Sequence, residues 1–293
     1  MVRKNVAIGL NIPIAVGGGN DPVALAVEAE RLGFDFVSAN DHLNGPGARH
    51  ETWTMLAWIA ASTRRIRVAS RVLAVPYRNP AVLAKMAETF DRLSAGRLIL
   101  GLGAGASEEE LAAFGIGTAT LGARITGLEE AIRISRGLWT DERFTFAGSI
   151  HRTDAAQVEP KPAHPIPIWV GTHGRRGIAL TGRLADGWIA SIDLAPPEVA
   201  PAMLASLDRA AASAGRDPDA ITRVYNVTVD LDGEAEGDPH RVVGSSDKVA
   251  ERLAGLLDLG FDALNLIPVG NQSPDQLARV GNEVLPRLRA ART

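Results

Sequence analysis

The sequence predicts an α/β protein built as a parallel (β/α)8 TIM barrel. Three observations support this fold class: strand-like and helix-like segments alternate along the chain, eight of each are found, and 293 residues suit such a barrel. A doubly wound open sheet is the competing arrangement, because it uses the same alternation. We expect residues 1–293 to form one domain, since no linker, internal repeat or low-complexity segment interrupts the pattern.

Short apolar runs predict the eight strands. They cover residues 6–13, 34–41, 65–76, 97–103, 166–172, 187–192, 223–231 and 262–269. Apolar residues three and four positions apart, such as Leu83, Met86 and Phe90, predict helices that each cover the sheet with one face. These patterns lie at 25–32, 55–60, 83–93, 128–139, 178–184, 202–214, 249–257 and 277–288.

Two segments depart from strict alternation, and we expect both to be insertions. The connection GAGASEEELAAFGIGTATLGAR follows the fourth strand and is long enough to shape a substrate site. After the next helix, ERFTFAGSIHRTDAAQVEPKPAHPIP alternates apolar and polar residues and then becomes rich in proline. This second segment predicts a hairpin followed by an extended lead-in to the fifth strand.

Composition excludes several classes of protein. A formal charge of −3, with no basic tail, argues against nucleic-acid binding, and no uncharged stretch is long enough for a membrane span. The start MVRKNVAIGLNIP predicts a first strand rather than a cleaved signal, so we expect a cytoplasmic protein. Without cysteine there is no thiolate ligand or disulfide, and without H-x-H, H-E-x-x-H or G-x-S-x-G motifs we expect neither a metal site nor a serine hydrolase.

The chemistry of such a barrel lies at the carboxyl ends of its strands. Asp41-His42 is the adjacent carboxylate and imidazole pair in such a place, and we expect it to be catalytic. The alternative is that Asp41 turns the loop and His42 is polar surface. Asn11 and Pro76 also close strands, and Trp53 and Trp188 follow or lie on others, so these four are candidate substrate contacts. Core packing is the alternative for both tryptophans.

Two glycine-containing segments follow strands. The segment 101–106, GLGAGA, formally fits a dinucleotide fingerprint, but it lies in the fourth unit and leads into a loop. We expect its small residues to let the backbone approach a ring system, and the alternative is a tight turn without a ligand. The segment 171–177, GTHGRRG, opens a predicted helix beside two arginines, which suits a phosphate. An exposed arginine pair on an ordinary loop is the alternative.

Several stretches of the chain resemble those of a known family. The stretches that carry the likeness are AERLGFDFVSANDH, RIRVASRVLAVPYRNPAVLAKMAETFDRLSAGRLILGLGAG, EAIRISRGLWT, PIPIWVGTHGRRGIALTGRLADGW and VGSSDKVAERLAGLLDLGFDALNL. They are similar to the bacterial luciferase-like superfamily of flavin- and deazaflavin-dependent oxidoreductases. The resemblance implies a luciferase-like barrel with a flavin or deazaflavin ring in its mouth, and the insertions after strand four and its helix.

The resemblance also assigns site residues. It places Asp41 and His42 near the reactive edge of the ring, and it implies a bulge with a non-proline cis peptide at or beside Arg71-Val72, preceded by Ser70. The implied cofactor contacts are Asp41, Ser70, Arg71, Val72, Ala104, Gly105 and Ala106, with Gly171, Thr172, His173, Gly174 and Arg175 as the phosphate loop.

Within the superfamily, the sequence of these stretches looks most like that of the branch that uses coenzyme F420, an 8-hydroxy-5-deazaflavin that transfers only hydride. We therefore expect oxidation of an alcohol, or reduction of an activated C=C or imine. Sugar-phosphate dehydrogenases of that branch carry a glutamate where this chain has Ala106, which puts that substrate in doubt unless Glu108 or Glu109 folds inward. The alternatives are an FMN-dependent monooxygenase and a non-catalytic flavin-binding barrel. Relatives imply a homodimer, a small-molecule substrate and a separate flavin or F420 reductase.

Overall fold

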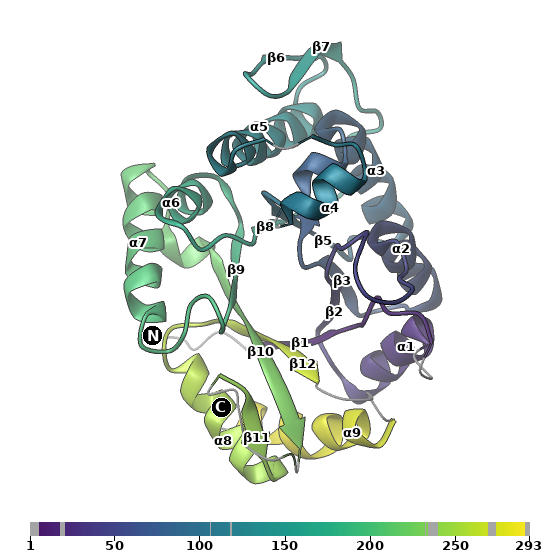
Figure 1. Ribbon diagram of the computed structural model, residues 1–293, viewed down its shortest axis with the longest axis vertical. Coiled ribbons are helices and arrows are strands. Elements are labelled where there is room, and N and C mark those ends of the chain that lie inside the picture. Colours follow the sequence, from purple (N-terminus) through teal and green to yellow (C-terminus); the bar gives the residue numbers. More distant parts are fainter. Residues whose placement is uncertain are drawn as a thin grey trace.

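The computed structural model describes residues 6–17, 21–105, 107–117, 119–231, 233, 240–268 and 274–290, and within them eight parallel strands close into a barrel (Figure 1). Each strand pairs with the next in the ring, and the last pairs with the first, so the predicted barrel is confirmed. The strands in ring order are β1 (Ala7–Asn11), β2 (Phe36–Ala39), β3 (Arg67–Ser70), β5 (Leu98–Gly103), β8 (Ile168–Val170), β9 (Gly187–Ser191), β10 (Thr222–Leu231) and β12 (Ala263–Pro268).

Helices surround the ring of strands (Figure 1). Side chains that cap their first turns decide where several of them begin. Asn79, for example, accepts hydrogen bonds from the backbone N–H groups of Ala81 and Val82, and Pro80 occupies the first helical position. The principal helices are α1 (Pro22–Leu32), α2 (Thr52–Ser62), α3 (Pro80–Leu93), α5 (Leu121–Thr140), α6 (Arg175–Leu184), α7 (Ala200–Ser213) and α8 (Ser246–Leu257). None of the described helices combines the length and apolar character needed to cross a membrane.

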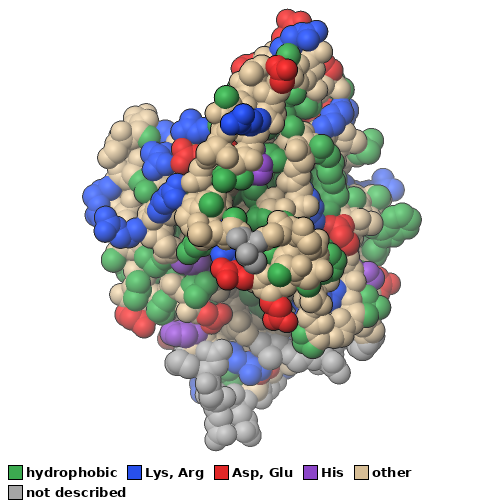
Figure 2. Space-filling view, turned by 45° about the horizontal axis from the view of Figure 1, so that its top comes forward, with side chains coloured by type: hydrophobic (Ala, Val, Ile, Leu, Met, Phe, Trp, Pro, Cys, Tyr) green, Lys and Arg blue, Asp and Glu red, His purple; other side chains and the backbone are tan. Residues whose placement is uncertain are grey.

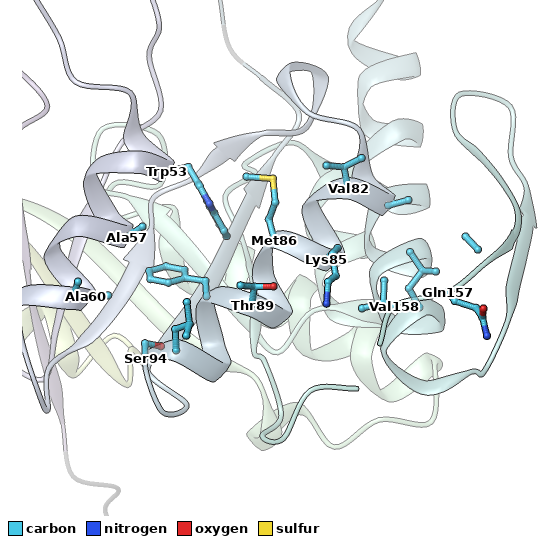
Figure 3. Close-up of a pocket in the computed structure, with 16 residues that line it drawn as sticks. Trp53, Ala57, Ala60, Val82, Lys85, Met86, Thr89, Ser94, Gln157 and Val158 are labelled. Carbon is cyan, nitrogen blue, oxygen red and sulfur yellow. The ribbon is translucent and has the colours of Figure 1, made fainter. Parts of the chain in front are cut away.

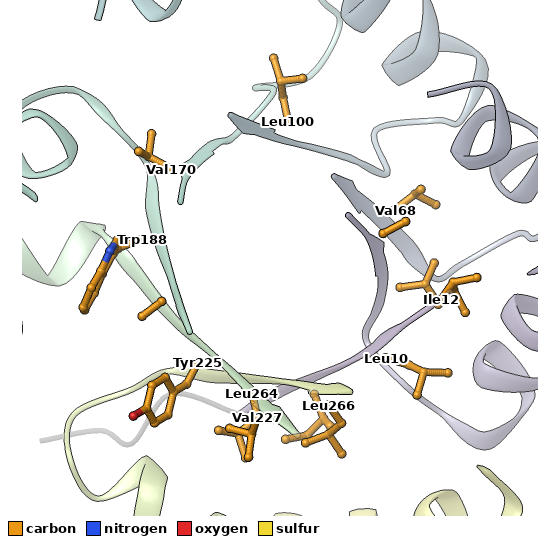
Figure 4. Packing of buried hydrophobic residues seen from close by; sticks show 14 of the residues in the cluster. Leu10, Ile12, Val68, Leu100, Val170, Trp188, Tyr225, Val227, Leu264 and Leu266 are labelled. Carbon is orange, nitrogen blue, oxygen red and sulfur yellow. The ribbon is translucent and has the colours of Figure 1, made fainter. Parts of the chain in front are cut away.

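Side chains alternate between the two faces of the barrel wall. The larger apolar cluster lies between the wall and the helices, and Figure 4 shows members such as Val68, Val170 and Trp188 pointing out of the ring. A smaller cluster fills the lower interior, where Phe36 and Trp169 pack edge to face with ring centroids 5.5 Å apart.

A polar layer lies two residues further along the strands, towards their carboxyl ends. Ser38 Oγ donates to Asn265 Oδ1 at 2.9 Å, and Asn265 Nδ2 donates to Asn226 Oδ1 at 2.8 Å. All three side chains are buried. This hydrogen-bonded layer carries no formal charge, and it separates the apolar lower interior from the mouth of the barrel.

Both predicted insertions are present. Helix α4 (Glu108–Ala113) follows β5, and the hairpin of β6 (Phe144–Ala147) and β7 (Arg152–Ala156) follows α5. Other elements were not expected from the sequence. A short strand β11 (Val242–Gly244) pairs with β10, and the last predicted helix is divided into α9 (Pro274–Arg279), a π-helical turn η3 (Val280–Val284) and α10 (Leu285–Ala290). The 3-10 turns are η1 (Val75–Tyr77) and η2 (Pro218–Ala220).

The predicted third strand, residues 65–76, is interrupted. β3 ends at Ser70, and pairing with β5 resumes only at β4 (Leu73–Ala74). The peptide bond between Arg71 and Val72 is cis, as the family resemblance implies. The interruption therefore coincides with the expected bulge, and it lies at the mouth of the barrel.

Candidate active site

A cavity of about 580 Å³ opens at the carboxyl ends of β2, β3, β5 and β8. Most of the residues predicted for the cofactor and for catalysis line it, although they come from four separate segments. They are Asp41, His42, Arg71, Val72, Ala104, Gly105, Gly171, Thr172, His173, Gly174 and Arg175. Ala106 lies outside the described residues, and Ser70 does not line the cavity.

The bulge explains why glycines surround it. A Cβ atom on Gly103 would lie 2.5 Å from Val72 Cγ2, and one on Gly171 would lie 3.0 Å from the same atom. Val72 therefore occupies the space that side chains at these two positions would need. The dinucleotide interpretation has no support, because α4 begins only at Glu108, several residues beyond the end of β5.

Ser70 has a structural part in this arrangement. Its hydroxyl donates to the carbonyl oxygen of Gly101 at 2.9 Å and accepts from the Gly101 N–H at 2.8 Å. These two backbone groups face the gap where the ladder between β3 and β5 is interrupted. The fully buried Ser70 side chain therefore replaces missing strand pairing, and it supports the bulge from behind the cavity wall.

Asp41 is held by an arginine. Its two oxygens accept hydrogen bonds from Arg78 at 2.6 and 3.1 Å, and Oδ2 also accepts from the backbone N–H of Ala74 at 3.0 Å. Burial lowers the pKa of Arg78, but Asp41 and Glu51 outweigh burial and leave it above its ordinary value. Asp41 thus fixes the segment after the bulge against the end of β2, which is a positioning arrangement.

His42 faces a carboxylate that the sequence analysis did not select. Its Nδ1 lies 3.2 Å from Glu110 Oε2, and its side chain is 40% exposed whereas that of Glu110 is 4% exposed. Burial raises the pKa of Glu110, but hydrogen bonds from the Asn44 N–H, the Tyr77 hydroxyl and His42 together hold it below the ordinary value. An ionised Glu110 accepts a hydrogen bond, so His42 Nδ1 carries a proton and Nε2 is the ring nitrogen left to exchange a proton with another molecule.

Tyr77 lines the cavity beside this pair. Burial and the neighbouring Glu110 raise the pKa of its hydroxyl, so the phenol stays protonated and donates to that carboxylate. Glu110 was missed because three successive glutamates open α4, and Glu108 and Glu109, the two considered from the sequence, are exposed. Ser107 caps α4 by accepting from the Glu110 N–H at 3.0 Å, which sets the rotation of the helix.

The other end of the cavity is the start of α6. Gly174 is its N-cap residue and has no side chain to accept from the first N–H groups of the helix, so these donors stay available to an anion. Arg175 is exposed there and makes no hydrogen bond or ion pair to any described residue. Arg176, by contrast, donates to Gly122 O at 2.9 Å and to Thr126 Oγ1 at 2.7 Å. Basic side chains gather on this side of the molecule, where α6 and α7 lie (Figure 2).

His173, in the same loop, has an imidazole ring whose tautomer is fixed by a hydrogen bond. Its Nε2 accepts a hydrogen bond from the Ser191 N–H at 3.1 Å, which requires that nitrogen to be unprotonated. Burial lowers the pKa of His173 and so favours the neutral ring. The proton is therefore on Nδ1, and the ring offers an N–H donor at the cavity wall.

The structure does not bring the four predicted substrate residues to the cavity wall. Trp188 is fully buried outside the barrel ring, where its Nε1 donates to the Thr172 carbonyl at 2.8 Å and supports the loop from behind. Asn11 lies below the cavity and accepts from Arg71 Nε at 3.0 Å. Pro76 lies in η1 beside a separate small cavity. None of the four residues lines the cavity.

Trp53, the fourth of them, packs edge to face with Phe90 and lines an apolar groove of about 650 Å³ on the outside of the barrel (Figure 3). The groove runs along α2 and α3, and exposed Val82 and Leu93 border it. A further cavity of about 820 Å³ opens at the opposite end of the barrel. In the described part of the chain, no three His, Asp or Glu side chains are grouped so that they could hold a metal ion.

Comparison with known proteins gives consistent results. Residues 13–237 match a family model described as luciferase-like monooxygenase. The chain is 30% identical to an F420-dependent glucose-6-phosphate dehydrogenase of Nakamurella multipartita, over 93% of this chain and 94% of that protein. It is 38% identical to an F420-dependent hydroxymycolic acid dehydrogenase of Mycobacterium tuberculosis, over 67% and 55%.

Solved structures show the same fold. An F420-dependent secondary alcohol dehydrogenase, in complex with an F420–acetone adduct, superimposes with a TM-score of 0.86 at 19% identity, covering 97% of this chain and 99% of that one. A long-chain alkane monooxygenase superimposes with a TM-score of 0.81 at 15% identity, covering 99% and 92%.

Proposed function

The chain belongs to the luciferase-like monooxygenase family, and from that premise we propose that it is a coenzyme F420-dependent oxidoreductase acting on a small organic substrate. One observation carries the proposal. A single cavity joins the paired His42 and Glu110 at one side to the uncapped start of α6 and Arg175 at the other. The two relatives described above are named as F420-dependent dehydrogenases, which supports this choice of cofactor.

The residues present fit a deazaflavin with a phosphate-bearing tail. Val72 and the backbone of residues 103–105 offer a flat, side-chain-poor wall for the ring. The α6 N–H groups, Arg175 and the His173 Nδ1–H offer donors for the phosphate. When bound, coenzyme F420 would supply or accept a hydride, that is, a proton with two electrons.

His42 moves the matching proton. For an alcohol substrate, the hydroxyl proton passes to His42 Nε2 while the carbon gives up its hydride, and the products are a carbonyl compound and a protonated imidazole. Glu110 keeps the ring in the required tautomer and stabilises its positive charge. Tyr77 and the Asn44 N–H hold Glu110 ionised for this purpose. In the opposite direction the same nitrogen returns the proton to the substrate.

Titration of the apo-protein with F420 and with FMN tests the cofactor. We expect F420 to bind in the micromolar range or tighter, and at least tenfold tighter than FMN, when binding is followed by fluorescence. Equal or tighter binding of FMN would refute the choice of F420 and favour an FMN-dependent monooxygenase. Binding of F420 without turnover of any alcohol, activated C=C or imine would favour a non-catalytic barrel.

We also propose that the protein is a cytoplasmic homodimer supplied by a separate F420 or flavin reductase. The exposed apolar side chains along α2 and α3 support self-association, since Leu93 is 82% and Val82 is 58% exposed. Light scattering after size-exclusion chromatography should give twice the mass of 30.9 kDa. A monomeric mass would contradict the dimer and leave the proposed reaction unaffected.

A further inference from the structure

Arg71 places a positive charge in the mouth of the barrel. Its backbone N–H donates to the Ala39 carbonyl at 2.7 Å, its Nε donates to Asn11 Oδ1 at 3.0 Å, and the side chain lines the cavity. Among the described residues, no carboxylate forms an ion pair with it. Burial lowers the pKa of Arg71 to about 10, so the guanidinium is still charged at neutral pH.

The acidic groups near the cavity are already matched. Arg78 takes both oxygens of Asp41, while Glu110 accepts from His42, Tyr77 and the Asn44 N–H. Below the guanidinium, the interior layer is built from uncharged amide and hydroxyl groups. Arg71 therefore lines a cavity whose described carboxylates, Asp41 and Glu110, are both paired with other groups of the protein. A partly buried cation without an ion-pair partner favours an anionic ligand.

Position within the ring separates this charge from the proposed phosphate site. Asn11, which holds Arg71, ends β1, and the phosphate loop follows β8, which is four strands away in either direction around the eight-stranded ring. Arg71 itself follows β3, and its Nε bond to Asn11 directs the guanidinium towards the β1 side of the ring, away from the phosphate loop. His42 follows β2, which lies between β1 and β3 in the ring, so it is on the same side of the barrel mouth as Arg71. The anion that pairs with Arg71 belongs to the molecule that exchanges its proton with His42.

We propose that Arg71 binds a carboxylate of the substrate, so that the substrate class is a hydroxy acid and its keto acid. This inference rests on the proposed function. The free edge of the guanidinium matches a carboxylate in charge and in planar two-point geometry. A phosphate dianion would need further cations beside Arg71, and the other arginines that line the cavity, Arg175 and Arg176, lie at the phosphate loop. In the oxidation, the C–H hydride goes to F420, the hydroxyl proton goes to His42, and the carboxylate is unchanged.

Binding of matched small probes tests the inference. Isobutyrate and isobutyramide have the same shape and differ in charge, and calorimetry can measure both with wild-type protein, Arg71→Gln and Arg71→Lys, each loaded with F420. We expect the wild type to prefer isobutyrate by about 10- to 100-fold, which is the range for a buried charge-assisted pair. Arg71→Gln should abolish that preference, and Arg71→Lys, which keeps the charge and loses the planar geometry, should retain part of it.

Three results would overturn the inference: equal binding of both probes by the wild type, a preference that survives in Arg71→Gln, or a more than tenfold loss of F420 affinity in that variant. The last would assign Arg71 to the cofactor. Thermal unfolding shows that the variants fold, and we expect Arg71→Gln to unfold at or above the wild-type temperature, because it removes an unmatched buried charge. The probes are also measured without F420. If F420 fails to bind the wild type, the proposed function is refuted, and Arg71-dependent isobutyrate binding by the free protein still decides the inference.

Discussion

Replacement of Ser70 by alanine tests how the bulge is stabilised. The substitution removes both hydrogen bonds between the Ser70 hydroxyl and Gly101, and it leaves a backbone N–H and a backbone carbonyl in a buried position. An unsatisfied buried polar group costs about 1–3 kcal/mol, so two such groups predict a loss of about 2–6 kcal/mol in the free energy of unfolding. The new methyl group cannot restore either bond.

Urea unfolding of wild-type protein and Ser70→Ala measures this loss, with Ser135→Ala as the matched control. Ser135 is equally buried, but its hydroxyl only donates to the Ala131 carbonyl within α5, so its removal should cost less than about 1 kcal/mol. F420 affinity should change by less than about threefold in Ser70→Ala, because Ser70 does not line the cavity. A loss no larger than that of the control would refute this account of the bulge.

The remaining predictions concern charge and close packing. Arg175→Gln should weaken F420 binding about 5- to 10-fold at low salt, whereas the control variant Arg133→Gln should bind F420 as the wild type does. If Arg175→Gln and the wild type bound F420 with equal affinity, Arg175 would not belong to the phosphate site. Hydrogen bonds from three backbone N–H groups outweigh burial and hold the pKa of Glu130 below 4.5, so its stabilisation is present above pH 4.5 and is lost as the pH falls through the lowered value. Glu130→Gln should therefore be about 1–3 kcal/mol less stable than wild type at pH 7. If urea unfolding gave the same difference in free energy of unfolding between the two proteins at pH 3 as at pH 7, this explanation would be contradicted. Gly103→Ala should lose about 1–3 kcal/mol of stability by displacing Val72, and unchanged thermal unfolding would show that the bulge can adjust.

The sequence was sufficient to predict the barrel and much of the cavity wall. Apolar periodicity is a local property, and parallel strands bring their carboxyl ends to one edge, so residues as distant as His42 and Gly171 could be placed together. The family resemblance supplied the position of the cis peptide at Arg71-Val72.

Rotation of elements and side-chain partners could not be read from the sequence. Glu110, rather than Glu108 or Glu109, turns inward because the cap at Ser107 sets the phase of a short helix. Strand alternation explains the outward side chain of Trp188, since its neighbour Ile189 fills the barrel interior. The alternation could be seen in the sequence, but deciding which face points into the barrel requires the register of the whole sheet.

The pairing of Asp41 with Arg78 depends on a contact across 37 positions of sequence. Such a contact is fixed by the path of the chain after the bulge. It changes the interpretation of Asp41 from a group beside the reacting atoms to a positioning residue, although its place in the cavity wall was predicted correctly.

The rate of hydride transfer in His42→Ala, measured with saturating F420 and a substrate of the wild type, tests the central claim most directly. The account predicts a fall of about 10²- to 10⁴-fold, as expected for a lost acid–base group, with F420 affinity within about threefold of the wild type. An unchanged rate of hydride transfer at normal F420 affinity would contradict the claim that His42 exchanges the proton.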